Sequence, residues 1–322
     1  MMSITILIRC CRDSLQRIIT ANIKLNVDGS VSSHATRKKY ANGLHQIFRD
    51  LEALGFKLTD ASNLKGKHLI ALGKDWEQQA IAGKLKPSTI QGKFSMLRVF
   101  ARWIGKDGMV ETTHRYVDQA LIQRSSVSAY DHSWSAQGVD VAAKLEEISQ
   151  KDPRVGLQLR LEFESGLRGK EAMMVRPYLA DKGAYLDVSV GTKGGRPRAV
   201  PINTAGQRTL LDEAKAFSAT KDSSTSDPSR SLAQWKNHYY YVLRSCGISR
   251  KNGITAHGLR HAYANNRYKE LSGQDSPVRG GKLINREDDR AARIQVAEEL
   301  GHSRESITTH YLGRDDGKDK DE

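Results

Sequence analysis

The first part of the chain carries apolar residues at helical spacing. In residues 34–55 they recur every three or four positions, and the segment ends on a glycine. The same spacing predicts helices over 64–82 and 86–105, where Pro87 suits a first turn, and a short helix over 112–122. We therefore expect a helical domain over residues 34–123, preceded by an N-terminal extension over 1–33.

The second part combines helices with one pair of strands. Residues 139–148, 231–246 and 257–271 have helical spacing. Two short apolar runs, 184–190 and 199–202, flank the glycine-rich sequence GTKGGRPR, which predicts an antiparallel hairpin. The polar stretch 272–289 predicts a loop. Residues 298–311 predict a helix, a break at Gly-His and a further helical turn.

Leucine and phenylalanine alternate with other residues over 157–163, and this period alone predicts a strand. Between the two parts lies RSSVSAYDHSWSA, residues 124–136, whose serines are typical of a linker. The second domain then spans 137–313, and the charged residues 314–322 form a tail typical of disorder.

Charge and cysteine content narrow the function. The 322-residue chain has a net charge of +14, which favours a polyanionic partner such as nucleic acid, although a charge that serves only solubility is the alternative. Of its three cysteines two are adjacent and none forms a C-x-x-C pair, so we expect neither a disulfide framework nor a zinc site. The apolar run 3–8 is too short to cross a membrane and lacks the features of a secretory signal. We expect a cytoplasmic, nucleoid-associated protein.

Four short motifs carry chemically competent side chains in the second domain. They are GLRGKE (166–171), TKGGRPR (192–198), HGLRH (257–261) and LGH (300–302) followed by Tyr311. His257 and Arg260 are three residues apart, so on a helix both point to one side, where they suit an anionic oxygen. Each motif alone has a plain structural interpretation: a turn at Lys193, a helix cap at His302, a core tyrosine at Tyr311. Their joint occurrence in this order favours a site.

With these motifs, residues 139–312 resemble the tyrosine recombinase family, also called phage-type integrases. The helices before these motifs resemble the family only in their general helical character and carry no specific motif. The resemblance implies a mainly α fold with a small antiparallel β-sheet, made of a helical core DNA-binding domain and a mixed α/β catalytic domain. It also implies a helix rather than a strand over 157–163, and we adopt the helix. The implied activity is metal-independent cutting and rejoining of DNA, with no cofactor and no metal.

The resemblance assigns three residues to the transfer of the phosphate. Tyr311 is implied as the nucleophile that forms a 3′-phosphotyrosine. Lys193 is implied as the acid that protonates the leaving 5′-oxygen, and His257 as the group that accepts the tyrosine proton. Covalent attachment conserves the phosphodiester energy, so rejoining needs no ATP.

Four more residues are implied around the phosphate. Arg168 and Arg260 would clamp its non-bridging oxygens and His302 would donate a further hydrogen bond. Glu171, one helical turn after Arg168, would hold an arginine or a histidine in place. His261 and His310 match no catalytic position, and we expect them to be structural.

Basic residues on the polar helix faces and at the hairpin are expected to contact DNA, although a solvated face has the same pattern. They are Arg37, Lys38, Lys39, Lys93, Arg98, Arg196 and Arg198. The resemblance implies a homotetramer on two double-stranded DNA sites, with accessory DNA-bending or directionality proteins and no membrane partner. Integration or excision of a mobile element is the expected role. Resolution of DNA dimers, a type IB topoisomerase and a DNA-binding protein that does not cut are the alternatives.

The chain departs from the family pattern in two places. The segment between Arg260 and His302 is longer than in compact members, and we interpret it as a surface insertion rather than an added DNA contact. The residues after Tyr311 offer no strong apolar anchor for a neighbouring subunit.

Overall fold

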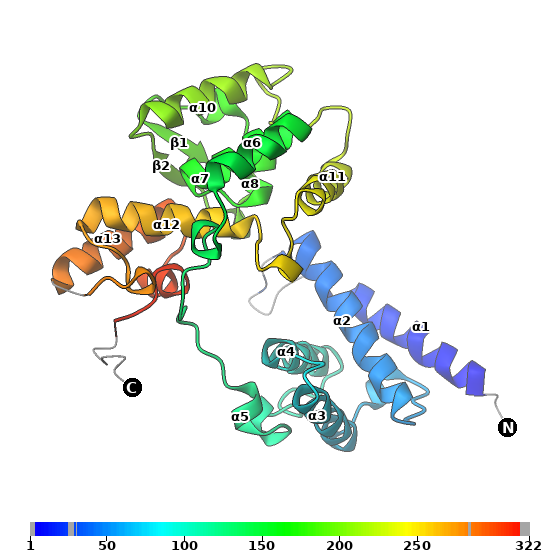
Figure 1. Cartoon of the computed structure of the whole chain (residues 1–322). Helices are drawn as coiled ribbons and strands as arrows, with labels where there is room; N and C mark the ends of the chain where they lie inside the picture. The colour runs from blue at the N-terminus through cyan, green and yellow to red at the C-terminus, as the bar shows by residue number, and fades with distance from the viewer. Residues whose placement is uncertain (1–3, 25–28, 30, 283–284, 316–322) are drawn as a thin grey trace. The chain divides into compact units, whose positions relative to one another are not determined.

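The structure is a computed structural model that describes residues 4–24, 29, 31–282 and 285–315. The chain divides into two compact units, Met1–Ser125 and Ser126–Glu322, shown in Figure 1. The division lies inside the serine-rich stretch 124–136. Of the expected tail, residues 316–322 lie outside the described part of the chain.

The N-terminal unit is helical. Its α-helices are α1 (Ile4–Asn22), α2 (His34–Ala53), α3 (Gly66–Ile81), α4 (Pro87–Trp103) and α5 (Gln119–Ile122). The Ser33 side chain caps α2 by accepting a hydrogen bond from the Thr36 backbone N–H at 3.1 Å. Gly55, with a φ of +86°, takes the left-handed conformation that ends this segment.

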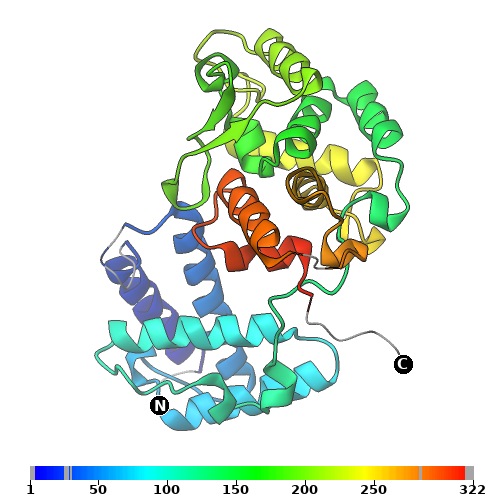
Figure 2. The same ribbon diagram turned by 90° about the vertical axis from the view of Figure 1, so that its left-hand side faces the viewer.

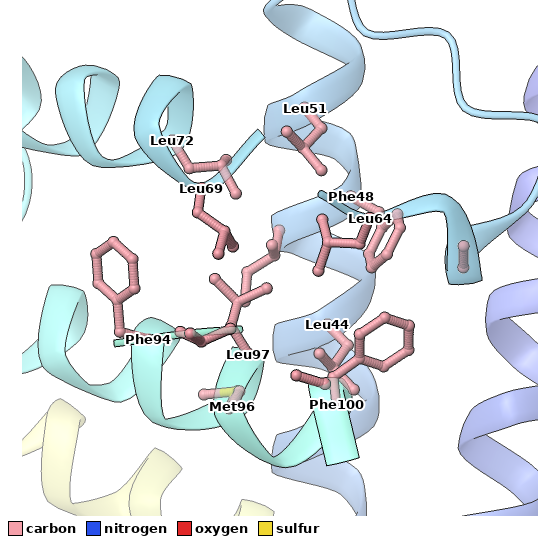
Figure 3. Close-up of a cluster of buried hydrophobic side chains, with 14 of the residues drawn as sticks. Leu44, Phe48, Leu51, Leu64, Leu69, Leu72, Phe94, Met96, Leu97 and Phe100 are labelled. Atoms are coloured by element: carbon pink, nitrogen blue, oxygen red, sulfur yellow. The ribbon is translucent and has the colours of Figure 1, made fainter. Parts of the chain in front are cut away.

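Leucines and aromatic residues from α2, α3 and α4 point toward one another in the core of this unit (Figure 3). Leu15 and Ile19 of α1 belong to the same core. Residues 1–33 therefore contain a helix that packs with the rest of the unit, which the hydrophobic pattern did not predict.

The expected helix over 112–122 is wrong. Residues 113–115 form a single 3₁₀ turn, and α5 begins only after Asp118. Asp118 is extended, and its side chain accepts a hydrogen bond from the Ala120 backbone N–H at 2.9 Å. This cap starts a new helix and so breaks the run of apolar positions in two.

The second unit combines helices with one pair of strands, as predicted. Its α-helices are α6 (Val141–Lys151), α7 (Pro153–Ser165), α8 (Gly169–Met174), α9 (Pro177–Ala180), α10 (Ala205–Ala216), α11 (Leu232–Ser245), α12 (His257–Ser272), α13 (Arg286–Glu299) and α14 (Thr309–Leu312). Strands β1 (Tyr185–Val188) and β2 (Arg198–Pro201) pair antiparallel, with Leu186 opposite Val200, and form the predicted hairpin. Helix α10 was not predicted.

Helix α7 lies at the centre of the second unit and packs against α6, α8, α10 and α12. Because neighbours cover it on several sides, even its polar Gln158 and Glu162 are buried. An all-round buried helix has no amphipathic stripe, and this is why the local period suggested a strand. The helix implied by the family resemblance is confirmed.

Two boundaries differ from the expectation. Trp134, placed in the linker, is fully buried in the second unit, and its Nε1 donates a hydrogen bond to the Thr255 carbonyl at 2.7 Å. The loop expected over 272–289 is shorter, because Asn285 caps α13 by accepting a hydrogen bond from the Glu287 N–H at 2.8 Å. The acidic residues that follow suit the positive N-terminal end of a helix.

Candidate active site

Tyr311 lies against residues of the HGLRH and LGH motifs. It lies in α14, and its side chain is buried. Its hydroxyl accepts a hydrogen bond from Arg260 Nε at 3.3 Å and lies 3.4 Å from His302 Nε2. The rings of His257 and His261 also lie against it, with centroids 5.8 and 4.8 Å away. In Figure 2 the red segment that includes α14 runs beside the orange α13.

Two guanidinium groups converge next to this hydroxyl. Arg260 is fully buried in α12 and donates hydrogen bonds to the carbonyls of Gly166 and Leu300. Burial lowers the pKa of Arg260 to about 10, so it remains charged at neutral pH. Arg168 donates to the same Leu300 carbonyl at 3.3 Å, and its side chain is partly exposed. The shared acceptor brings both positive charges to one place.

The Glu171 carboxylate binds two arginines, Arg168 and Arg198. Its fully buried carboxylate accepts hydrogen bonds from the Arg168 backbone N–H and from Arg168 Nη1, both at 2.8 Å. It also accepts two from Arg198, at 3.0 and 2.7 Å. Burial would raise the pKa of Glu171, but the guanidinium groups prevail and lower it to about 2. Its partners are therefore arginines and not histidines.

Arg198 does not have the expected position of a DNA contact. Its side chain is almost fully buried, bound to Glu171 and, through Nε, to the Glu299 carbonyl at 2.7 Å. These bonds leave it unavailable to a phosphate, so this prediction is corrected. A signal was present, because strand alternation places Arg198 on the same face as the buried Val200.

His257 and His302 are neutral at physiological pH. Loss of hydration on burial, reinforced by the charges of Arg260 and Arg168, lowers the pKa of each imidazole to about 4. Each ring therefore has one nitrogen that can accept a proton and one that can donate a hydrogen bond.

The hairpin tip exposes Lys193 and Arg196 to solvent. Gly194 and Gly195 both have positive φ, which the tight tip between β1 and β2 requires. The charge of Lys193 contributes to lowering the pKa of His302, so the tip is within electrostatic reach of the site.

The basic residues of the N-terminal unit have different surroundings. Lys38 and Lys39 are exposed on α2, and Arg37 donates from Nε to the Ser32 carbonyl at 2.9 Å. Arg98 donates to the Glu111 carbonyl at 2.9 Å. Lys93 is mostly buried, because its Nζ lies 2.6 Å from Asp50 Oδ2 and over the Trp76 ring. That ion pair removes Lys93 from the set of expected DNA contacts.

A second buried carboxyl, Glu162, lies beneath the start of α8. A Cβ on Gly169 would come within 3.3 Å of its Oε1. The Tyr239 hydroxyl donates a hydrogen bond to the same oxygen. Here burial prevails over that hydrogen bond and over the charge of Arg260, and raises the pKa of Glu162 to about 8.

Two polar residues to which the sequence assigned no catalytic role, His261 and Asn265, also lie next to Tyr311. The His261 ring is buried, and its Nδ1 has no hydrogen-bond partner within the described residues. Burial, together with His257 and His132, lowers the pKa of His261 to about 3. Asn265, also fully buried, donates from Nδ2 to the Tyr311 carbonyl at 3.3 Å. His261 lies in the HGLRH motif but was expected to be only structural, and no motif marks Asn265, whose contact with Tyr311 depends on how α12 and α14 pack.

The three cysteines are free thiols. In residues 4–24, 29, 31–282 and 285–315 no cluster of His, Cys, Asp or Glu is arranged to hold a metal ion. Over the same described residues, no helix has the length and apolar character needed to cross a membrane.

Two protein families match the chain in sequence. One, described as "Integrase", matches residues 124–266, and the other, described as "Phage integrase, N-terminal", matches residues 18–110. The chain belongs to the phage-type integrases. It is thus an enzyme of the tyrosine recombinase family, which breaks and rejoins DNA. No curated protein matches the sequence of this integrase.

Solved structures share the fold of this integrase. XerH site-specific recombinase bound to difH substrate in a pre-cleavage complex is 16% identical, with a TM-score of 0.57, and the match covers 96% of this chain and 82% of that one. The Tn1549 transposon integrase in complex with transposon right end DNA is 13% identical, with a TM-score of 0.56, covering 94% of this chain and 95% of that one.

Proposed function

We propose that this integrase is a site-specific recombinase that integrates or excises a mobile genetic element through a covalent bond between Tyr311 and DNA. The observation that carries the proposal is the position of the Tyr311 hydroxyl, within hydrogen-bonding distance of both Arg260 Nε and His302 Nε2. A phenol held beside a buried guanidinium is stabilised as its oxygen gains negative charge during attack.

These side chains supply every proton transfer that cleavage of one phosphodiester bond needs. The Tyr311 oxygen attacks the scissile phosphorus and its proton passes to the neutral imidazole of His257. The bond from phosphorus to the 5′-oxygen breaks, and Lys193 protonates that oxygen. Arg168, Arg260 and His302 stabilise the charge on the non-bridging oxygens. Glu171 keeps Arg168 oriented, the Gly166 and Leu300 carbonyls keep Arg260 oriented, and rejoining reverses each transfer.

The DNA contacts outside the active site are proposed from the charge and exposure of basic side chains. Exposed Lys38, Lys39 and Arg196, with Arg37 and Arg98, are proposed to contact phosphates, which makes affinity fall steeply with salt. Residues 34–123 would form the core DNA-binding domain and 137–313 the catalytic domain. We propose a homotetramer on two DNA sites in the cytoplasm, aided by DNA-bending or directionality proteins.

The test is covalent capture. Wild-type protein is incubated with a library of nicked duplexes that have a randomised core, and adducts are separated under denaturing conditions. We expect a protein–DNA adduct with wild type, none with Tyr311→Phe, and a normal yield with Tyr241→Phe, a tyrosine exposed on α11. If the library gives no adduct while binding persists, the chain is a DNA-binding protein that does not cut, and the proposal is wrong.

The role of Lys193 has its own test. A 5′-bridging phosphorothiolate leaves as a thiolate, which needs no proton at neutral pH. We expect Lys193→Ala to lose cleavage of normal DNA and to regain it on this substrate. A Tyr311→Phe control should cleave neither.

A further inference from the structure

The loop between α12 and α13 packs against the segment that carries Tyr311. We refer to residues 273–282 as the 273–282 loop. Its 3₁₀ turn, Pro277–Arg279, contacts α14. Gly313, directly after α14, approaches the loop so closely that a Cβ there would lie 2.7 Å from Val278 Cγ1. The extra chain between Arg260 and His302 is therefore not a plain surface insertion.

A buried pair of polar side chains connects the loop to the Tyr311 backbone. Asn265 donates from Nδ2 to the carbonyls of His261, at 2.8 Å, and Tyr311, at 3.3 Å. Its Oδ1 accepts a hydrogen bond from the hydroxyl of Ser276 in the loop. Both side chains are fully buried. Rotating the amide would set its oxygen against two carbonyl oxygens, so the carbonyls fix its orientation, and the Ser276 hydroxyl supplies the donor that the buried Oδ1 requires.

Helix α14 depends on such external bonds. It has only four residues, Thr309–Leu312, and one helical turn is not stable alone. Its carbonyls and the next one accept hydrogen bonds from elsewhere: Thr309 from the Ser128 N–H at 2.9 Å, and Gly313 from Arg293 Nη1 at 3.1 Å. The place of the tyrosine is thus set by its neighbours.

The loop is itself anchored. Arg279 donates from Nε to Asp131 Oδ2 and from Nη1 to Asn266 Oδ1, each at 2.8 Å. Asp131 is buried at the start of the second unit, in the same segment as Ser128. The 273–282 loop and the segment with Ser128 and Asp131 therefore fix the position of α14 jointly.

We propose that the 273–282 loop fixes the Tyr311 hydroxyl in its attacking position, with Ser276 and Asn265 as positioning residues that act through the Tyr311 backbone. This inference rests on the proposed role of Tyr311 as nucleophile. The contacts of the hydroxyl, at 3.3 and 3.4 Å, are near the limit of hydrogen bonding, so a small displacement of α14 breaks both. A misplacement of about 1 Å at a reacting group costs on the order of 100-fold in rate.

The first experiment measures single-turnover adduct formation on a nicked duplex captured by the wild-type protein. We expect Ser276→Ala to slow cleavage about 10-fold, because it displaces Tyr311 by only part of that distance. The affinity for the duplex should be unchanged. Ser276→Thr, which keeps the hydroxyl, should restore most of the rate. Ser272→Ala is the matched control and should leave the rate unchanged, because its hydroxyl bonds to the Tyr268 carbonyl and to the Gln274 carbonyl and N–H, not to Asn265. A Ser276→Ala rate equal to wild type overturns the proposal.

The second experiment needs no cleavage. Amide hydrogen exchange in the DNA-free full chain should be faster over residues 309–313 in Ser276→Ala than in wild type or Ser272→Ala, with α7 unchanged. Equal exchange over 309–313 in Ser276→Ala and in the wild type overturns the proposal that the loop positions Tyr311. Absence of any wild-type adduct overturns the proposed function instead, so the two failures are told apart.

Discussion

Two buried glutamates of the second unit have opposite charge states. Glu171 and Glu162 are both inaccessible to solvent, and Arg260 influences both. The pKa of Glu171 is lowered to about 2, whereas the pKa of Glu162 is raised to about 8. Burial is thus the same in both places and does not decide the charge.

The difference lies in the donors. Glu171 receives hydrogen bonds from two guanidinium groups and a backbone N–H, which together outweigh the loss of hydration. Glu162 receives the neutral hydroxyl of Tyr239, which does not. The carboxyl that orients the arginines therefore stays ionised, and the one beneath it stays protonated and adds no competing negative charge.

The largest effect is expected for Glu171→Gln. The change removes the charge that compensates Arg198, which stays buried. Breaking a buried ion pair in this way costs about 3–5 kcal/mol. We expect that loss in the urea unfolding of the second unit, followed by hydrogen exchange of α7, together with loss of adduct formation. A loss no larger than that of Glu162→Gln contradicts the comparison.

An intermediate effect is expected for Tyr239→Phe. The variant keeps the ring but removes the hydroxyl that bonds to Glu162, and leaving a buried polar group unsatisfied costs about 1–3 kcal/mol. The same unfolding measurement at pH 6 checks it. The free energy lost in the Tyr239→Phe, Glu162→Leu double variant should be smaller than the sum of the losses in the two single variants. A loss equal to that sum would contradict the pairing of Tyr239 with Glu162.

At pH 5 the smallest effect is expected for Glu162→Gln, and this effect changes with pH. In the unfolded chain this carboxyl loses its proton near the ordinary value of 4.5, but in the folded chain it keeps it to about 8. Wild type therefore loses stability as pH rises between these values, and the variant does not. We expect the two to differ by about 1 kcal/mol or less at pH 5, with the difference moving in favour of the variant toward pH 8.

Glu171 has the opposite sign. Its folded pKa of about 2 lies below the ordinary 4.5, so its contribution is present above pH 4.5 and is lost as pH falls toward 2. Acid unfolding curves of wild type and Glu171→Gln should therefore converge at low pH. Curves that stay parallel would show that Glu171 is not the ionised group.

Local patterns predicted the elements whose faces are half exposed. Helices α2, α4 and α6 have one buried stripe and clear end signals, and the β1–β2 hairpin has a glycine-rich tip. Helix α7 lacked such a stripe because neighbours bury most of it, and only the family resemblance gave the correct element.

The site shows the same limit. The motifs marked Arg168, Arg260, His302 and Tyr311, and the structure brings these four together. The alternation of strand β2 indicates that Arg198 faces inward, but no local pattern indicates that its partner is Glu171 or that Ser276 bonds to Asn265. Such pairings depend on which distant elements pack together, and the sequence pattern of one element carries no information on its neighbours.

The acceptors that orient Arg260 are main-chain oxygens, those of Gly166 at the end of α7 and Leu300 at the end of α13. No change of side chain can delete a carbonyl. A substitution that leaves the course of the two helix ends unchanged therefore keeps both acceptors in place. The insertion or deletion of one residue at either end turns its carbonyl away at once. The orientation of Arg260 therefore depends on the number of residues at the ends of α7 and α13.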